Sequence, residues 1–461
     1  MTTPSPTDNA GAGAENAAPR WSAWRVVVNL GIVSLVIDLS SKGGQSLTGP
    51  LLGQLGASAL IVGIVTGLGE AVALALRLVT GPWSDRTGRY WRFAIVGYAL
   101  TAVCLPLLAV TPFIGGAGLL LASALILGDR NGKAIRSPAK TVLLANAASA
   151  VGRGRGFAVH KLLDQLGSLL GPLIAWAVIA VTAVLWPAFA VLAIPGAVGM
   201  GVLLWTRRRV PDTNVYESGE GGEGGEGLAP SLANLADQPD QPDPADPAHP
   251  PDPAHPPDQG NPEHPESSAG PRLPLSFYLL AAAVGVSTVG LVGFGVISFH
   301  LTDAGIVPLA TVPLIFAAAM AASALAALAS GYAYDAAGAR VLLVLPLLVV
   351  LVPGLTLSLQ AGAVLAGALI WGAATGIQES TAQALVADLV PNGHRGTAYG
   401  VFAAFGGAAA LLGGVLAGAL YDRVPWLVAI VGILQVCSLI LFLVTFRLQR
   451  RERLQPAEDQ V

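Results

Sequence analysis

Long apolar segments follow one another along almost the whole chain. Of its 461 residues, 53% are hydrophobic and only 11% are charged, and the mean hydropathy is +0.64. A soluble globule needs a more polar surface than this composition provides. A bilayer core about 30 Å thick requires roughly 20 apolar residues per helix. Twelve segments of this kind predict transmembrane helices at 24–44, 58–80, 93–110, 115–136, 157–181, 187–205, 277–299, 310–331, 341–359, 363–386, 398–420 and 426–446.

The apolar segments form two groups of six, separated by a polar stretch. Residues 211–270 contain 13 acidic residues and no Lys or Arg, together with the runs GEGGEGGEG and DPAHPPDPAHPPD. Such a stretch buries too little apolar surface to fold. We therefore expect an all-α membrane protein with two six-helix bundles related by pseudo-two-fold symmetry. The expected parts are an N-terminal tail at 1–20, a bundle at 21–206, a linker at 207–273, a second bundle at 274–448 and a C-terminal tail at 449–461.

Basic residues outside the linker gather at one end of the apolar segments. The loops at the opposite ends are short and nearly neutral, whereas the basic ends carry Arg86, Arg89 and Arg92, then Arg207–Arg209, and finally Arg447, Arg450, Arg451 and Arg453. Cytoplasmic loops of membrane proteins are enriched in Lys and Arg. We therefore expect a multi-pass protein of the cytoplasmic membrane, with both termini and the linker in the cytoplasm.

A short pattern of Gly, Asp and Arg recurs at equivalent places in the two halves, after the second and the eighth apolar segments. Glycines permit a tight turn, and arginines hold a loop at the membrane headgroups. The repeat indicates an internal duplication. Its positions are Gly81, Asp85, Arg86, Gly88 and Arg89 in the first copy, and Asp335, Gly338 and Arg340 in the second.

This repeated loop resembles the signature of the major facilitator superfamily, and the resemblance extends over nearly the whole chain outside the linker and tails. It implies a transporter that alternates between two access states, in which Asp85 holds the two halves together in the outward-facing state. A loop that only anchors the protein at the headgroups is the alternative for this segment. The stretches 128–147 and 376–400 resemble a bacterial group of efflux carriers.

A Gly-Pro motif in the fifth apolar segment is similar to one found in proton-coupled antiporters. Here it reads Gly167, Gly171 and Pro172, but Leu173–Trp176 stand where that pattern has further glycines. The direction of antiport therefore stays open.

Ionisable residues inside the apolar segments are costly, at roughly 2.5–3.5 kcal/mol each at the bilayer centre, and usually serve a function. They are concentrated in the first half. A carboxylate without a nearby cation in a medium of low dielectric constant can bind and release a proton near neutral pH. The residues expected to couple transport to protons are Asp38, Glu70, Asp129, Arg130, Asp164 and Glu379, and those expected to line the substrate cavity are Lys42, Arg136, His160 and Gln378.

The spacing of these residues suggests partners. Asp38 and Lys42, like His160 and Asp164, are four residues apart and could form ion pairs within their helices, with either a structural or a coupling role. The fourth segment places Asp129, Lys133, Arg136 and Lys140 on one helix face. A rise of about 1.5 Å per residue places Asp129 and Arg130 in the inner third of the membrane, and Arg136 and Lys140 at the headgroups.

The sequence favours a proton-driven exporter of a small organic molecule. Efflux of a divalent transition metal is the nearest alternative, since His249, His255 and His264 of the linker could bind metal. A non-transporting scaffold or sensor is a second. No catalytic motif of known type occurs, so we expect neither an enzyme nor a cofactor or resident metal. With 6% aromatic residues, no stacking cage is expected.

The expected partners are a small-molecule substrate, protons and the lipid bilayer, with no nucleic acid, and the expected state is a monomer.

Overall fold

The computed structural model describes residues 21–216, 273–382, 385–386, 389–390 and 395–454. Helices account for all regular secondary structure within these ranges. The first half is built from α1 Ala23–Ser46, α2 Thr48–Gln54, α3 Ala59–Thr87, α4 Tyr90–Leu107, α5 Gly118–Ser149, α6 Arg153–Thr182, α7 Trp186–Val191 and α8 Ala193–Arg209.

The second half repeats this plan with more interruptions. A π-helical turn, Gln378–Ala382, directly follows α14. The helices of this half are α9 Leu275–Val289, α10 Phe294–Asp303, α11 Thr311–Ala337, α12 Val344–Val349, α13 Val352–Thr356, α14 Ala361–Ile377, α16 Arg395–Ala419 and α17 Val424–Leu454.

Ten of the helical segments in the described part of the chain are long and apolar enough to cross a membrane. One of them, Thr311–Thr356, has 46 residues and turns back at Gly338, whose φ is +64°, so it makes two crossings. The helix α5 adds another crossing. It has 32 residues but carries too many charges to qualify by hydropathy. The predicted twelve crossings in two six-helix bundles are thus confirmed, and the protein is a multi-pass membrane protein.

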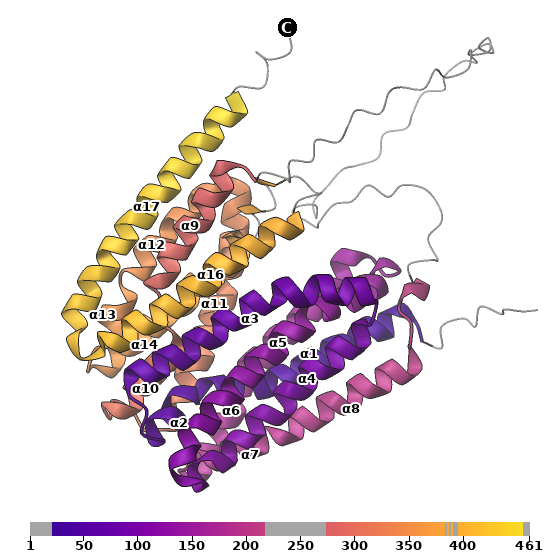
Figure 1. Ribbon diagram of the computed structural model, residues 1–461, viewed down its shortest axis with the longest axis horizontal. Coiled ribbons are helices and arrows are strands. Elements are labelled where there is room, and N and C mark those ends of the chain that lie inside the picture. The colour runs from indigo at the N-terminus through magenta and orange to yellow at the C-terminus, as the bar shows by residue number, and fades with distance from the viewer. Residues whose placement is uncertain (1–20, 217–272, 383–384, 387–388, 391–394, 455–461) are drawn as a thin grey trace, which may run out of the picture.

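The two halves lie side by side, and α3 and α16 run along each other between them (Figure 1). Glycines make this close approach possible, since a side chain at Gly63 or Gly67 of α3 would strike the backbone of α16. The helices α6 and α11 form a second contact between the halves. A pseudo-two-fold axis exchanges these two contacts, because each joins the second crossing of one half to the fifth crossing of the other.

All chain ends of the two bundles lie on one side of the membrane domain, which we call the linker side. An even number of crossings per half requires this, and the start of α1 and the turn Asn214–Tyr216 after α8 are in contact. The Tyr216 hydroxyl donates to the Trp21 carbonyl at 2.7 Å, and burial raises the pKa of this tyrosine. The first residues of the predicted linker are therefore packed on the first bundle, whereas 1–20, 217–272 and 455–461 lie outside the described residues.

The repeated Gly-Asp-Arg pattern is mostly helical and not a loop. Gly81, Asp85 and Arg86 belong to the last turns of α3, which ends in a left-handed residue at Gly88, with a φ of +60°. The second copy is alike, because α11 runs through Asp335 and ends at Gly338. The expectation that the glycines make the turn is confirmed only for Gly88 and Gly338, which have a positive φ, whereas Gly81 lies within α3. Arg89 follows this turn, as Arg340 follows Gly338.

Candidate functional site

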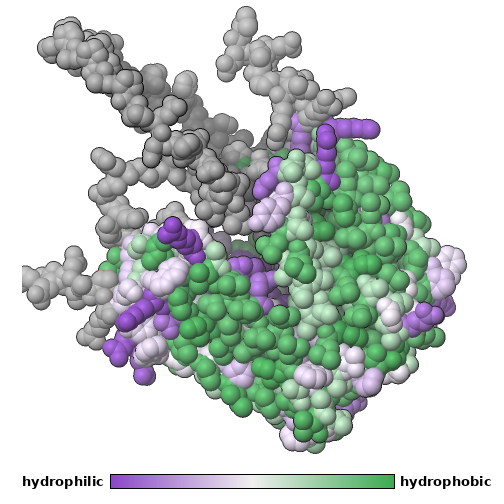
Figure 2. All heavy atoms as spheres, turned by 180° about the vertical axis from the view of Figure 1, so that it is seen from behind, coloured by the Kyte–Doolittle hydropathy of each residue, from purple (hydrophilic) through white to green (hydrophobic). Residues whose placement is uncertain are grey.

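A large cavity of about 1410 Å³ lies between the two halves. It is lined by α1, α3, α5 and α6 of the first half and by α10, α11, α14 and α16 of the second. From behind, Figure 2 shows a hollow with hydrophilic side chains inside it, between two strongly hydrophobic surfaces. Hydrophilic side chains thus lie in the hollow between the halves, while the surfaces on either side of it are hydrophobic.

The cavity extends toward the linker side and is closed on the opposite, far side. Its lining reaches Asp85 at the end of α3 and Tyr399 near the start of α16. On the far side α2 packs against α10, because Gly49 leaves room for the backbone of Gly295. The ring of Phe299 covers Gly53 next to this contact. The structure is therefore an access state open on one side only.

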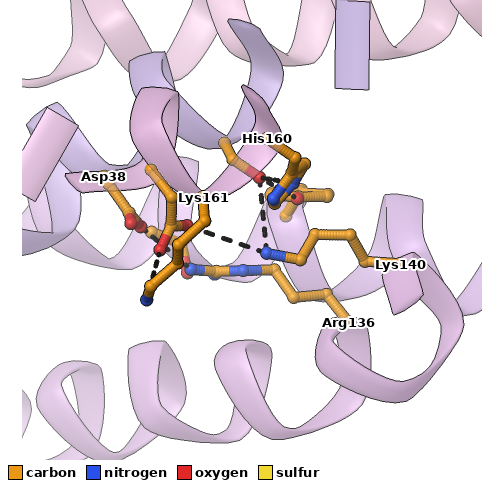
Figure 3. A network of polar contacts seen from close by, with 9 residues as sticks. Asp38, Arg136, Lys140, His160 and Lys161 are labelled. Carbon is orange, nitrogen blue, oxygen red and sulfur yellow. Dashed lines mark hydrogen bonds and ion pairs between the residues drawn. The ribbon is translucent and has the colours of Figure 1, made fainter. Parts of the chain in front are cut away.

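Arg136 connects three helices at the wall of the cavity (Figure 3). Its guanidinium lies 3.7 Å from the Asp38 carboxylate of α1, donates to the Thr101 hydroxyl of α4, and stands 4.9 Å from the centre of the Tyr98 ring. The side chains of Arg136 and Asp38 are only 6% and 15% exposed. A guanidinium held by this many partners fixes the position of the Asp38 carboxylate.

Asp164 of α6 is held by two lysines, at 3.7 Å from Lys140 and 3.5 Å from Lys161. Its carboxyl group is a close neighbour of that of Asp38, and the two groups influence each other electrostatically. The Lys140 ammonium also donates to Ser34 at 3.4 Å, and Ser34 contacts the His160 ring nitrogen Nε2 at 2.9 Å. Two adjacent carboxyl groups are thus surrounded by three cations between α1, α5 and α6 (Figure 3).

A second group of charges surrounds Glu70 of α3. Arg130 of α5 lies 2.7 Å from its carboxylate, and Lys133, Lys42 and Arg77 are its further cationic neighbours. The strongest electrostatic influence on Lys133 comes from Lys42 of α1. No carboxylate within the described residues lies within 4.0 Å of either lysine, so this part of the wall carries an excess of positive charge.

The second half contributes one carboxylate and mostly apolar groups. Glu379 stands in the π-helical turn after α14 and lines the cavity opposite Arg77, which it attracts. Gln378 beside it donates to the Thr288 hydroxyl at 2.7 Å. Phe294 lies 4.4 Å from Phe316 and 5.5 Å from Trp371 between ring centres, and all three rings line the cavity.

Several predictions for individual residues were wrong. Asp129 is buried next to Cys104 of α4 and does not line the cavity, so its predicted role in proton coupling stays a prediction. Arg136 is buried in the first bundle and not at the headgroups. The spacing-based partners also differ: Asp38 pairs with Arg136 instead of Lys42, and Asp164 pairs with lysines instead of His160. His160, which was expected to line the cavity, lies behind the cavity wall, where its Nε2 contacts the Ser34 hydroxyl. Of the residues expected to line the cavity, Lys42, Arg136 and Gln378 do so. The coupling candidates Asp38, Glu70, Arg130, Asp164 and Glu379 also lie at the cavity, and their coupling role stays a prediction.

Sequence reasoning missed the aromatic cluster of Phe294, Phe316 and Trp371. A stacking surface was not expected from the low aromatic content, yet three rings from α10, α11 and α14 meet in one place. It also missed Ser34 and Tyr98, which connect α1 to α4. No local pattern marks these positions, because each ring or hydroxyl comes from a different helix.

The comparisons with known proteins agree with this architecture. A family model described as Major Facilitator Superfamily matches residues 30–307 and 275–460. The chain belongs to this superfamily. A major facilitator superfamily (MFS) protein is a secondary transporter that works by alternating access, and a one-sided cavity between two bundles fits such a carrier.

Relatives of this MFS protein occur in mycobacteria. An uncharacterized protein of Mycobacterium tuberculosis is 44% identical over 425 residues, which cover 92% of this chain and 93% of the relative. An uncharacterized MFS-type transporter of Methanocaldococcus jannaschii is 28% identical over 142 residues, 31% of this chain and 34% of its own length.

Solved MFS structures share the fold at low identity. A variant of the nucleoside transporter NupG has a TM-score of 0.65 at 12% identity, covering 91% of this chain and all of its own. A bacterial homologue of the lysosomal transporter Spinster, in an inward-facing and occupied conformation, has a TM-score of 0.62 at 12% identity, with 92% and 97% covered. These similarities show the fold and not the substrate.

The described part of the chain contains no group of three or more His, Cys, Asp or Glu side chains placed to hold a metal ion. His249, His255 and His264, on which the metal alternative depends, lie outside the described residues. Transition-metal efflux thus stays a prediction from composition.

Proposed function

We propose that this protein is a proton-coupled exporter that moves a small organic molecule out of the cytoplasm. The observation that carries the proposal is the carboxyl pair Asp38 and Asp164, at the wall of a cavity that opens on one side only. Two adjacent carboxylates repel each other and therefore tend to share a proton. A site of this kind can take up and release one proton per transport cycle.

The neighbours of the pair explain how a proton would act on the fold. Arg136 joins Asp38 of α1 to α4 and α5, and Lys140 joins Asp164 of α6 to α5. A proton on the pair removes one negative charge and weakens these attractions. The helices α1 and α6 are then less firmly held to α5. Since α1 and α6 also contact α10 and α11 of the other half, protonation would influence the contact between the halves.

The Gly-Pro motif of α6 supports the same site. Side chains at Gly167 and Gly171 would strike the backbone of α1 at Leu35 and Leu39. These glycines therefore allow α1 and α6 to approach so closely that Asp38 and Asp164 become neighbours. The motif resembles that of proton-coupled antiporters, and here its physical role is to bring two carboxyl groups together.

The charge distribution indicates how the protein is oriented in the membrane, and this orientation bears on the direction of transport. The ends of α3 and α8 on the linker side carry Arg86 and Arg207–Arg209, and the positive-inside rule assigns such ends to the cytoplasm. The cavity then opens to the cytoplasm, which is the state in which an exporter loads its substrate. The resemblance of 128–147 and 376–400 to efflux carriers favours export.

The test uses the access change itself, so that the substrate need not be known. In a background with Cys104→Ala and Cys437→Ala, a single cysteine replaces Ser137, which lines the cavity. The rate of labelling by a membrane-impermeant maleimide is measured in liposomes between about pH 5.5 and 8.5. Each rate is divided by the labelling rate of the same cysteine in protein unfolded with detergent. This ratio corrects for the pH dependence of the reaction between a thiol and maleimide.

We expect the normalised rate to change several-fold across this range and to become independent of pH in the variant with both Asp38→Asn and Asp164→Asn. Asp422→Asn, which removes a carboxylate in the far-side turn Tyr421–Arg423, is the matched control and should behave like the parent. A pH dependence that persists unchanged in the double variant would contradict the proposed role of the pair.

A further inference from the structure

The two walls of the cavity differ in chemistry. Its lining includes seven Lys and Arg residues, all from the first half, and five Asp and Glu residues, of which only Glu379 comes from the second half. The opposite wall presents rings and small residues. Its aromatic members from the second half are Phe294, Phe316, Trp371, Tyr399, Phe402 and Phe405.

Two lysines of the cavity lining do not take part in any of the ion pairs. Asp38 and Asp164 are neutralised by Arg136, Lys140 and Lys161, and Glu70 is neutralised by Arg130. Glu379 faces Arg77 across the cavity. Within the described residues, Lys42, Lys133 and Arg77 are then the cations of the wall that form no ion pair within 4.0 Å, and Glu70, their common neighbour, is already paired with Arg130.

Lys42 and Lys133 are moreover close to each other. They come from α1 and α5, both are partly buried, and each lies among the cations around Glu70. Two neighbouring ammonium groups in a region shielded from water repel each other, and an anion between them removes this cost. Gln45, one turn beyond Lys42, also lines the cavity, and its Oε1 has no hydrogen-bond partner. Its amide also carries two N–H donors, which are the groups that could contact an anion.

The aromatic cluster lies at the same level of the membrane as these charges. Gly295, the residue after Phe294, packs against Thr66 of α3, and Thr66 is one helical turn before Glu70. One turn corresponds to about 5 to 6 Å along the axis. A bound molecule of modest length can thus reach the lysines with one end and the rings of Phe294, Phe316 and Trp371 with the other.

We propose that the cavity binds an amphiphilic organic anion, with its acidic group between Lys42 and Lys133 and a planar apolar body against Phe294, Phe316 and Trp371. This inference rests on the proposed function only in taking the cavity as the transport site. An organic cation would meet the excess positive charge of the first half, and a neutral molecule would leave the two lysines uncompensated. The charge pattern therefore selects the anion.

The experiment measures binding to the purified full-length protein in detergent by calorimetry, at one pH and without any gradient. Three probes of similar shape are compared: 2-naphthoate, 2-naphthamide and 2-naphthylmethylammonium. Since a hydrogen bond to a charged group contributes about 1.5–3 kcal/mol, we expect naphthoate to bind at least about tenfold more tightly than the amide. The ammonium probe should bind most weakly.

Variants separate the two walls. Lys42→Gln and Lys133→Gln should each lower the affinity for naphthoate about tenfold or more and leave the amide unchanged, whereas Trp371→Leu should weaken all three probes by about two- to tenfold. Arg209→Gln removes an exposed positive charge at the end of α8 and serves as the control for overall charge. Lys42→Arg and Lys133→Arg keep the charge and should retain most of the binding, which distinguishes a loss of charge from misfolding.

Equal binding of naphthoate and the amide, tighter binding of the ammonium, or unchanged naphthoate affinity in both Lys→Gln variants would each overturn the proposal. Its failure is distinguishable from failure of proton coupling. If the labelling rate proves independent of pH, the affinities expected for the three probes stay the same. If the protein shows no preference for the anionic probe, the expected pH dependence of labelling stays the same.

Discussion

The two halves of this transporter share a backbone plan but differ in the chemistry of their cavity walls. In the first half α1, α3, α5 and α6 form a network of ion pairs, whereas α10, α11 and α14 of the second half contribute a cluster of rings. The contacts α3 with α16 and α6 with α11 nevertheless follow the same symmetry. The two halves therefore share the packing of their helices, while the charged and the aromatic side chains of the cavity are divided between them.

The largest effect should follow from breaking a charged contact in the first half. Arg136→Met leaves the Asp38 carboxylate without its main partner in a buried place, so we expect the free energy of unfolding to fall by about 3–5 kcal/mol. In the second half, Ser287→Ala removes the 2.9 Å hydrogen bond to Gln435. Gln435 still donates to the Ser287 carbonyl, so this change should cost only about 1 kcal/mol.

Both stabilities are measured by denaturant titration of the purified protein in detergent micelles. A double variant with Arg136→Met and Asp38→Asn should recover part of the loss, because the carboxylate no longer lacks a cation. Equal costs for Arg136→Met and Ser287→Ala would mean that the two halves do not differ in the way described.

An intermediate effect is expected from the glycines that bring helices together. Gly167→Val places a side chain against the backbone of α1, and Gly372→Val places one against Ala319 of α11. Each should destabilise the protein by about 1–3 kcal/mol. Only Gly167→Val moves Asp164 away from Asp38, so only this variant should lose the pH dependence of labelling at position 137. Loss of that dependence in Gly372→Val as well would assign the proton response to both halves.

The smallest effect should come from the two helix ends with the repeated pattern. Asp85 lines the mouth of the cavity and accepts a hydrogen bond from the Ser84 hydroxyl at 3.5 Å, whereas Asp335 is exposed and makes no ion pair with another described residue. Exposed charged contacts contribute up to about 1 kcal/mol, so Asp85→Asn should shift the labelling rate by at most about fivefold. Asp335→Asn should leave it unchanged. The same shift in both variants would mean that the two copies act alike.

The sequence predicted the fold well, because apolar length alone determines where a helix can cross a membrane. The span expected at 58–80, for example, lies within α3 except for Ser58, which caps that helix. Helix ends were less accurate, as α5 continues to Ser149 although its span was expected to end at residue 136, with Arg136 and Lys140 at the headgroups. Arg136 lies inside the first bundle because the neighbouring helices supply it with partners such as Thr101 and Asp38.

The site was predicted only in part, since spacing reports which residues share a face of one helix but not what that face meets. Lys133, Arg136 and Lys140 do line the cavity together, as the spacing indicates. Their partners lie on other helices and depend on how each helix is rotated about its axis. For the same reason, the rings of Phe294 and Trp371 could not be brought together from sequence.

The uneven distribution of charge also makes the protein sensitive to membrane voltage. All seven cations and four of the five carboxylates at the cavity belong to the first half, so an electric field across the bilayer acts mainly on that half. Moving one elementary charge through the full potential corresponds to about 2.3 kcal/mol per 100 mV. A displacement of the first half along the membrane normal therefore performs more electrical work than an equal displacement of the second half, whose cavity wall carries Glu379 alone.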